Sequence, residues 1–185
     1  MRIGIFGSHC VGKTTLVNKL KKTNKFFNYK YYEEGIRYLH EKKVLSYNDL
    51  KYEDQLMIQL DLINNIFYYQ NIITDRTPLD NFVYLLYYFG KDISTPKKNK
   101  LREIVFKATS KYDILIFADY RLELIDDNFR DLNEQFRTTI DDMIKNIFRQ
   151  FLEEYLVYHI KYSNFVIDGD IDYQRLIDYL CMIGD

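Results

Sequence analysis

The sequence has few of the residues that bend, break or cross-link a chain: 185 residues include 7 Gly, 2 Pro, 2 Cys and no Trp. Because Cys10 and Cys181 lie near opposite ends, a disulfide framework is not expected, and a reducing, cytoplasmic type of compartment fits better. The 3 histidines are scattered, so no spacing typical of a zinc site occurs. No Pro-, Gly- or Ser-rich linker and no internal repeat divides the chain. We therefore predict a single domain that covers residues 1–185.

Long hydrophobic runs and an excess of one charge are missing too. The longest apolar run, residues 82–89, is too short to cross a bilayer, and no signal-peptide pattern opens the sequence. The 26 Lys and Arg residues are balanced by 27 Asp and Glu residues, which does not favour a protein that holds nucleic acid mainly by charge. We expect no membrane partner and a cytoplasmic location, or the host cytoplasm if the protein is viral.

Apolar periodicity predicts strands that alternate with helices. The expected strands cover residues 2–6, 29–33, 71–75, 113–118 and 164–167, and the expected helices cover residues 13–22, 54–69, a segment that begins at Pro78, a segment around 101–108, 134–156 and 173–182. The helix over residues 54–69 is expected to carry one apolar stripe of Leu56, Leu60, Ile63 and Phe67. The alternation indicates an α/β fold with a parallel sheet covered on both faces, where ligands bind beyond the carboxyl ends of the strands.

A glycine-rich motif follows the first strand. Residues 7–14 have the sequence GSHCVGKT, which matches G-x-x-x-x-G-K-[ST] between an expected strand and an expected helix. In such a loop, backbone N–H groups turn around phosphate oxygens, and the helix N-terminus adds a positive dipole. Lys13 supplies a charge to the β- and γ-phosphates, and the Thr14 hydroxyl is a ligand for Mg²⁺. The predicted ATP-binding residues are Gly7, Ser8, His9, Cys10, Val11, Gly12, Lys13, Thr14 and Thr15.

The third strand ends in Asp75, at the edge of the sheet where ligands are expected. A carboxylate there suits Mg²⁺, held through water, so Thr14 and Asp75 form the predicted metal site. Two alternatives remain: Asp75 contacts the phosphate acceptor, or it caps the helix that begins at Pro78. No N-K-x-D element follows a strand and no Asp-Glu pair ends the third strand, which disfavours a GTPase and a motor-type ATPase.

Four motifs together resemble those of nucleoside and nucleotide kinases: the glycine-rich loop, EEGIR at residues 33–37, DRTPLD at 75–80 and DDNFR at 126–130. The chain is most similar to a family of small P-loop ATP-binding proteins, many from phages or bacteria, related to thymidylate, deoxynucleoside and nicotinamide-riboside kinases. The resemblance covers nearly the whole chain. It implies a P-loop NTPase fold, with a five-stranded parallel sheet of order 2-3-1-4-5 between helices and a lid at about residues 120–137.

The resemblance also implies roles for residues that contact the acceptor. Glu34 is expected to hold or deprotonate the acceptor hydroxyl; the alternatives are that Glu34 is a solvated carboxylate or that Glu33 takes the role. Arg37 clamps the acceptor or forms an ion pair with Glu34. Arg76 lies beside the phosphate or sugar of the acceptor or forms an internal salt bridge, and Asp80 is a further substrate-binding candidate.

In the lid, Arg130 and Arg137 are the expected catalytic arginines, with Arg121 as a further candidate, because related kinases close cations over the migrating phosphoryl group. The alternative is that both arginines are solvated in an acidic stretch. With Lys13, Asp75 and Glu34 they complete the predicted catalytic set. Residues 168–172 (DGDID) fall where related kinases wrap the adenine.

The sequence therefore predicts an ATP- and Mg²⁺-dependent phosphotransferase that acts on a small nucleoside or nucleotide. One alternative is a kinase for a hydroxymethylated base in phage-type DNA, which a near-neutral chain does not favour. The other is a nucleotide-binding regulatory ATPase without an acceptor. The chain has Glu-Gly and Asp-Arg-Thr where deoxynucleoside kinases have Glu-Pro and Glu-Arg-Ser, so the motifs do not identify the acceptor. The oligomeric state is left open, with a dimer as a plausible form.

Overall fold

A computed structural model of the chain describes residues 1–33, 50–119, 133–155, 161–165 and 170–183. In this part of the chain, five strands form one sheet of order β2-β3-β1-β4-β5. All neighbouring strands are parallel. The strands are β1 (Arg2–Phe6), β2 (Lys30–Tyr32), β3 (Ile72–Asp75), β4 (Ile114–Ala118) and β5 (Lys161–Phe165). The predicted parallel sheet and its strand order are confirmed.

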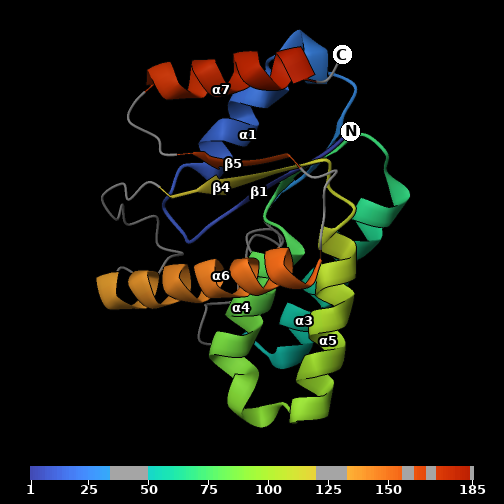
Figure 1. Cartoon of the computed structure of the whole chain (residues 1–185), viewed down its shortest axis with the longest axis vertical. Coiled ribbons are helices and arrows are strands. Elements are labelled where there is room, and N and C mark those ends of the chain that lie inside the picture. The colour runs from blue at the N-terminus through green and yellow to red at the C-terminus, as the bar shows by residue number, and fades with distance from the viewer. Residues whose placement is uncertain (34–49, 120–132, 156–160, 166–169, 184–185) are drawn as a thin grey trace.

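Helices cover both faces of the sheet (Figure 1). α1 and α7 lie on one face, and α3, α4, α5 and α6 lie on the other. The helices are α1 (Lys13–Lys21), α3 (Tyr52–Tyr68), α4 (Pro78–Phe89), α5 (Thr95–Thr109), α6 (Glu134–Glu154) and α7 (Asp170–Ile183), with short 3₁₀ turns η1 (Asn24–Phe26) and η3 (Gly90–Asp92). None of the helices in the described ranges is long and apolar enough to cross a membrane.

The two faces of β1 separate two hydrophobic cores. Side chains alternate along a strand, so Ile3 and Ile5 pack with α1 and α7, whereas Phe6 packs with α4 and α6. Gly4 lies between them, where a Cβ atom would come within 2.8 Å of Thr77 Cγ2 and 2.9 Å of Tyr112 Cε1. The lack of a side chain at Gly4 therefore lets the start of α4 approach the sheet closely, which positions the residues that follow β3.

Two local predictions differ from the structure. The last strand was expected over residues 164–167, but its pairing with β4 runs from Lys161 to Phe165. β5 is an edge strand, and its polar residues Lys161 and Ser163 gave no apolar signal. The other difference lies in α3.

The predicted apolar stripe of α3 is wrong at two positions. Leu60 is 44% exposed and Phe67 is 48% exposed. The buried face of α3 instead consists of Gln55, Ile58, Gln59, Leu62, Ile63 and Ile66. The two glutamines made this face look polar in the sequence, although both are fully buried.

Candidate active site at the carboxyl edge of the sheet

The loop between β1 and α1 has the backbone that a phosphate-binding loop requires. Gly7 has a φ of 145° and Gly12, the N-cap of α1, a φ of 82°, both in the region that favours glycine. A Cβ atom on Gly7 would lie 2.5 Å from the carbonyl oxygen of Ala118 at the end of β4. Cys10 also has a positive φ, of 56°, a conformation that non-glycine residues seldom adopt away from functional sites. The loop is therefore held in one shape by glycine geometry and by its close packing against β4.

Lys13 lies over this loop and is 5% exposed. Its Nζ donates hydrogen bonds to the carbonyl oxygen of Gly7, at 3.0 Å, and to that of Ser8. The ammonium group thus lies against the backbone of its own loop. A phosphate chain in that loop would meet both the lysine charge and the positive end of the α1 dipole.

The first turn of α1 meets the end of β3. The Thr14 hydroxyl donates a hydrogen bond of 2.5 Å to Asp75 Oδ2. β1 and β3 are neighbours, with Ile5 paired to Asp75, so the two strands bring the loop and the carboxylate to the same edge. A hydroxyl and a carboxylate are the oxygen donors that Mg²⁺ prefers, and two protein ligands with several waters are typical of Mg²⁺ beside phosphates. The donor set of Thr14 and Asp75 therefore fits Mg²⁺, while the described residues contain no cluster of three or more His, Cys, Asp or Glu for another metal.

Arg76 and Asp80 form a buried ion pair one helical turn apart. The Arg76 guanidinium lies 3.2 Å from Asp80 Oδ2, donates to the Gly7 carbonyl oxygen at 3.3 Å, and covers the Tyr84 ring at 4.8 Å. Asp80 Oδ1 accepts hydrogen bonds from the backbone N–H of Thr77, at 2.6 Å, and from its hydroxyl, at 2.8 Å. The internal salt bridge considered for Arg76 is thus present, and Asp80 closes the first turn of α4.

The first turn of α6 packs against the phosphate loop. The His9 ring stacks on Phe136 with centroids 5.4 Å apart, and His9 Nδ1 lies 3.4 Å from the Tyr84 hydroxyl. Arg137, the next residue of α6, is 6% exposed and pairs with Glu134 at 2.7 Å. The alternative of a solvated Arg137 is wrong, because the side chain is buried.

Lys145 links α6 to the carboxyl end of β4 through ion pairs. Its Nζ lies 2.7 Å from Asp119 Oδ1, just after β4, and 2.9 Å from Asp141 Oδ2, on α6 itself. Burial by itself would lower the pKa of Lys145, but the hydrogen bonds and charges of Asp119 and Asp141 outweigh it and raise the pKa above its ordinary value. Lys145 therefore remains charged and holds α6 beside the site.

Several predicted site residues lie outside the described residues, namely Glu34, Arg37, Arg121 and Arg130, together with most of the expected lid and residues 166–169. Glu33 is described: it is exposed and forms an ion pair with Lys21 on the surface. The described residues that the structure brings together at this edge are Lys13, Thr14, Asp75, Arg76, Asp80 and Arg137.

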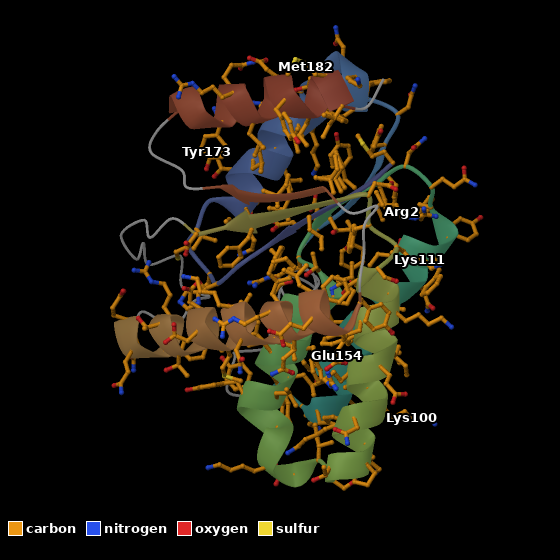
Figure 2. The ribbon with its side chains drawn as sticks, in the orientation of Figure 1. Arg2, Lys100, Lys111, Glu154, Tyr173 and Met182 are labelled. Carbon is orange, nitrogen blue, oxygen red and sulfur yellow. The ribbon has the colours of Figure 1, made fainter. Side chains whose placement is uncertain are left out.

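The contact between Tyr173 and the loop was not predicted from the sequence. The Tyr173 hydroxyl, on α7, donates a hydrogen bond of 3.2 Å to the Gly12 carbonyl oxygen, and the ring is 5% exposed. Figure 2 labels Tyr173 at one end of α7 and Met182 at the other. The contact joins residues 161 positions apart, and no local pattern encodes such a distance.

Three buried amide side chains beside the start of α4 were also missed. Gln59 Nε2 donates to the Pro78 carbonyl oxygen at 3.0 Å, and Gln55 Nε2 to that of Asn81 at 3.5 Å. Among the described residues, Gln55 Oε1, Gln59 Oε1 and Asn81 Nδ2 have no hydrogen-bond partner. Buried polar atoms are nearly always paired, and an exception needs a cause such as a missing ligand. The sequence did contain a signal for the two glutamines: Gln55 and Gln59 are four residues apart in an otherwise apolar helix, and this spacing places both on the same side of the helix.

Comparisons with known proteins identify the family and the fold. A family model described as an AAA domain matches residues 2–163. No curated protein sequence matches the chain significantly. Among solved structures, deoxyadenosine kinase from M. mycoides has a TM-score of 0.66 at 16% identity, covering 98% of this chain and 100% of that one. Thymidylate kinase from Candida albicans has a TM-score of 0.57 at 18% identity, covering 98% of this chain and 89% of that one.

The NadR protein, in complex with NAD and AMP-PNP, has a TM-score of 0.65 at 19% identity. The match covers 97% of this chain but 48% of the NadR chain, so this chain spans about half of that protein. At these identities the likeness concerns the fold alone.

Proposed function

The chain belongs to the family of this AAA domain, and from that premise we propose that it is an ATP- and Mg²⁺-dependent kinase for a nucleoside or nucleotide. One observation carries the proposal. The Thr14 hydroxyl, which follows Lys13 in the loop, donates a hydrogen bond of 2.5 Å to the carboxylate of Asp75 at the end of β3. Phosphoryl transfer asks the protein mainly for positioning and for positive charge around the γ-phosphate. The loop amides, Lys13 and the α1 dipole supply both.

On the ATP side, the phosphate chain lies in the curve of residues 7–15. Lys13 Nζ exchanges its bonds to the Gly7 and Ser8 carbonyl oxygens for phosphate oxygens, since a lysine has three donors and a flexible stem. Thr14 and Asp75 are the residues that would hold Mg²⁺, and the ion would supply positive charge beside the phosphate chain. The Thr14–Asp75 hydrogen bond keeps both groups in place when Mg²⁺ is not bound.

In the transfer step, an oxygen of the acceptor attacks the γ-phosphorus, and the bond to the β–γ bridging oxygen breaks, so that ADP leaves. Arg137 is our candidate for balancing charge on the transferred group: it is buried in the first turn of α6, and the residue before it, Phe136, stacks on His9 of the loop. Arg76 stabilises the loop, because it donates a hydrogen bond to the Gly7 carbonyl oxygen while its ion pair with Asp80 holds the guanidinium in place. In this proposal Glu34, Arg37 and Arg130 keep the acceptor and lid roles that the motifs imply.

On the acceptor side, the amides of Gln55, Gln59 and Asn81 support a nucleoside as substrate. Each glutamine nitrogen donates to a backbone carbonyl, which can only accept, so each Oε1 is the free atom. Two free acceptors and the Asn81 donor complement a base that has an exocyclic amino group next to a ring nitrogen, such as adenine or cytosine. The M. mycoides deoxyadenosine kinase, which has the same fold, is described with dCTP and with dATP.

A transfer screen with γ-labelled ATP tests the proposal across nucleosides, deoxynucleotides, nicotinamide riboside and hydroxymethylated DNA. We expect label on a nucleoside or nucleotide with an amino-bearing base. Gln59→Leu should lower kcat/KM for that acceptor by about ten-fold or more, with the KM for ATP unchanged, because it removes a hydrogen bond to the base. Gln135→Leu, at an exposed position on α6, is the matched control. Label on hydroxymethylated DNA alone, or ATP hydrolysis that no acceptor stimulates, would contradict the proposal.

A further inference from the structure

Three helices on one face of the sheet enclose a pocket of about 370 Å³, lined by residues of α4, α5 and α6. We call it the helical pocket. Its volume is within the range of small-molecule sites, about 300–1,000 Å³. None of the described residues that line it belongs to the phosphate loop, to β3 or to the first turn of α6. A molecule in the helical pocket would therefore not occupy the place of ATP.

The inner wall of the helical pocket is apolar. It consists of five residues from α4 and α6, three of which are at most 8% exposed. They are Phe82, Val83, Leu86, Met143 and Ile147. Met143 is half-buried, and its flexible, polarisable side chain can follow the shape of a bound ring. An apolar wall of this kind is the usual seat of the ring of a small ligand.

The outer edge of the helical pocket is polar, and its side chains have no other partners. Lys98 on α5 is half-buried, yet it forms no ion pair in the described part of the chain. The side-chain amides of Asn99, Asn146 and Gln150 form no hydrogen bond there either. Asn146 and Gln150 are four residues apart on α6, so they lie on the same side of that helix. A ligand would thus meet one ammonium group and three amides, each of which can donate and accept.

Arg102, which also lines the helical pocket, is already paired. Its guanidinium lies 2.5 Å from Glu154 on α6 and 4.9 Å from the centroid of the Phe106 ring. Figure 2 labels Glu154 at the end of α6 that meets α5. The ion pair balances the charge of Arg102, and the described lining residues include no Asp or Glu. Lys98 therefore makes the helical pocket positive.

We propose that the helical pocket binds a nucleoside monophosphate. The base lies on the apolar wall with its polar edge toward Asn146 and Gln150, and the phosphate lies at Lys98. A fatty acid would leave the amides without partners, and inorganic phosphate would leave the apolar wall uncovered. A triphosphate carries more negative charge than one lysine balances. A planar ring with donors and acceptors on its edge and one phosphate matches the wall, the amides and the single ammonium group together.

This site goes beyond the proposed kinase reaction and does not require it, because binding can be measured without ATP and without turnover. It would still bear on that reaction. α6 carries Met143, Asn146 and Gln150 at the helical pocket and Arg137 in its first turn. A ligand that bridges α5 and α6 would favour one position of α6, and so one position of Arg137.

Photolabelling of the full chain with 8-azidoadenosine monophosphate tests the location of the site. On irradiation the probe attaches covalently to residues beside it, and tryptic peptides show where. We expect label in residues 138–145 and 146–149, the tryptic peptides of α6 that contain Met143 and Asn146. Unlabelled AMP should suppress this label. Label that misses both peptides, such as label confined to residues 3–13 of the phosphate loop, would overturn the proposal, as would label that AMP does not suppress.

Variants at the edge of the helical pocket test the contacts. Lys98→Glu should raise the probe concentration for half-maximal labelling of α6 by about ten-fold or more, because a bond to the phosphate is replaced by repulsion. Lys100→Glu, at an exposed position of the same helix outside the lining, is the matched control and should label like the wild type. Asn146→Trp, also at an exposed position, should abolish the label by filling the pocket. Thermal unfolding shows that each variant is folded; a folded Lys98→Glu with wild-type labelling would contradict the proposal.

Competition against the probe identifies the class of ligand. AMP should suppress the α6 label at a concentration at least about ten-fold lower than adenosine or ribose 5-phosphate, since each of these lacks one half of the contacts. Adenosine that competes as well as AMP would remove the phosphate from the account. Decanoate that competes better than AMP would show that the helical pocket takes an apolar anion, and would overturn the assignment to a nucleotide.

Discussion

The Thr14 hydroxyl donates a hydrogen bond of 2.5 Å to Asp75, which joins the first turn of α1 to the end of β3 across 61 residues of sequence. The contact exists because β1 and β3 are parallel neighbours, so that the loop after one strand and the carboxylate at the end of the other reach the same edge. It brings the two oxygen ligands of the proposed Mg²⁺ site together beside Lys13. The proposed chemistry depends on this arrangement.

Lys13→Ala should lower kcat by a factor of about a thousand or more, because it removes the charge that meets the β- and γ-phosphates. The fold should persist, since Lys13 donates to the carbonyl oxygens of Gly7 and Ser8 in its own loop and does not belong to either hydrophobic core. Steady-state kinetics and a melting curve check both parts. Lys22→Ala, at the exposed C-cap of α1, is the control. Full activity in Lys13→Ala would remove the loop from the mechanism.

The sequence predicted the parts of the fold that local patterns encode. The bounds of β1, the start of α1 at Lys13, the start of α4 at Pro78 and the start of α6 at Glu134 were all predicted correctly. Each follows from a strong local signal: a buried strand, a glycine loop, a proline in the first helical turn, or a long periodic helix. The strand order came from the resemblance of the motifs to a known family.

The rest depended on contacts between distant residues. Two roles were predicted for Arg76, and the structure shows its ion pair with Asp80 in the first turn of α4. The stripe of α3 was misassigned because Gln55 and Gln59 lie on the buried face while Leu60 and Phe67 lie on the outside. Burial of an amide depends on partners elsewhere in the fold, and periodicity does not report them.

Asp75→Asn should weaken the dependence of turnover on Mg²⁺, because the amide keeps the shape of the side chain but loses its charge. We expect the Mg²⁺ concentration for half-maximal rate to rise by about ten-fold or more and kcat to fall. A Mg²⁺ titration at saturating ATP measures the shift, and Asp92→Asn, at an exposed position in η3, is the control. A wild-type response to Mg²⁺ in Asp75→Asn would refute the metal assignment.

Asp80→Asn should destabilise the protein more than it alters the chemistry directly. The carboxylate is fully buried, pairs with Arg76 and accepts two hydrogen bonds from Thr77. Removing one charge of a buried pair costs about 3 kcal/mol or more, which lowers Tm by roughly 6 °C or more in a domain of this size. Differential scanning calorimetry measures the change. A Tm equal to that of the wild type would show that the Arg76–Asp80 pair contributes nothing to stability.

Tyr173→Phe should weaken ATP binding with little change in kcat. The substitution removes only the hydroxyl that donates to the Gly12 carbonyl oxygen, so the loop loses one support from α7. Loss of one hydrogen bond corresponds to a rise of about two- to ten-fold in the KM for ATP. Tyr179→Phe, 40% exposed on the same helix, should behave like the wild type. A change in kcat alone would contradict a positioning role for Tyr173.

Stability should fall at alkaline pH because several tyrosines are held neutral by burial. Burial raises the pKa of Tyr31 to about 12, and it raises the pKa values of Tyr32 and Tyr112 further. A tyrosine whose pKa is higher in the folded protein than in the unfolded chain, where it is near 10, contributes stability below pH about 10 that is lost as the pH rises. Urea unfolding measured from about pH 8 to about pH 11 should therefore show a free energy of unfolding that falls as the pH rises past about 10. Tyr112→Phe should make the decline less steep; an unchanged slope would exclude Tyr112 as a cause.

The ratio of ADP formed with acceptor to ADP formed without it tests the central claim most directly. For a kinase, the amino-bearing nucleoside that accepts the label should raise ADP production by at least about a hundred-fold, with one phosphorylated product for each ADP. The increase should vanish in Lys13→Ala and depend on Mg²⁺. ADP production that is the same with and without every nucleoside and nucleotide, and that yields free phosphate only, would contradict the account.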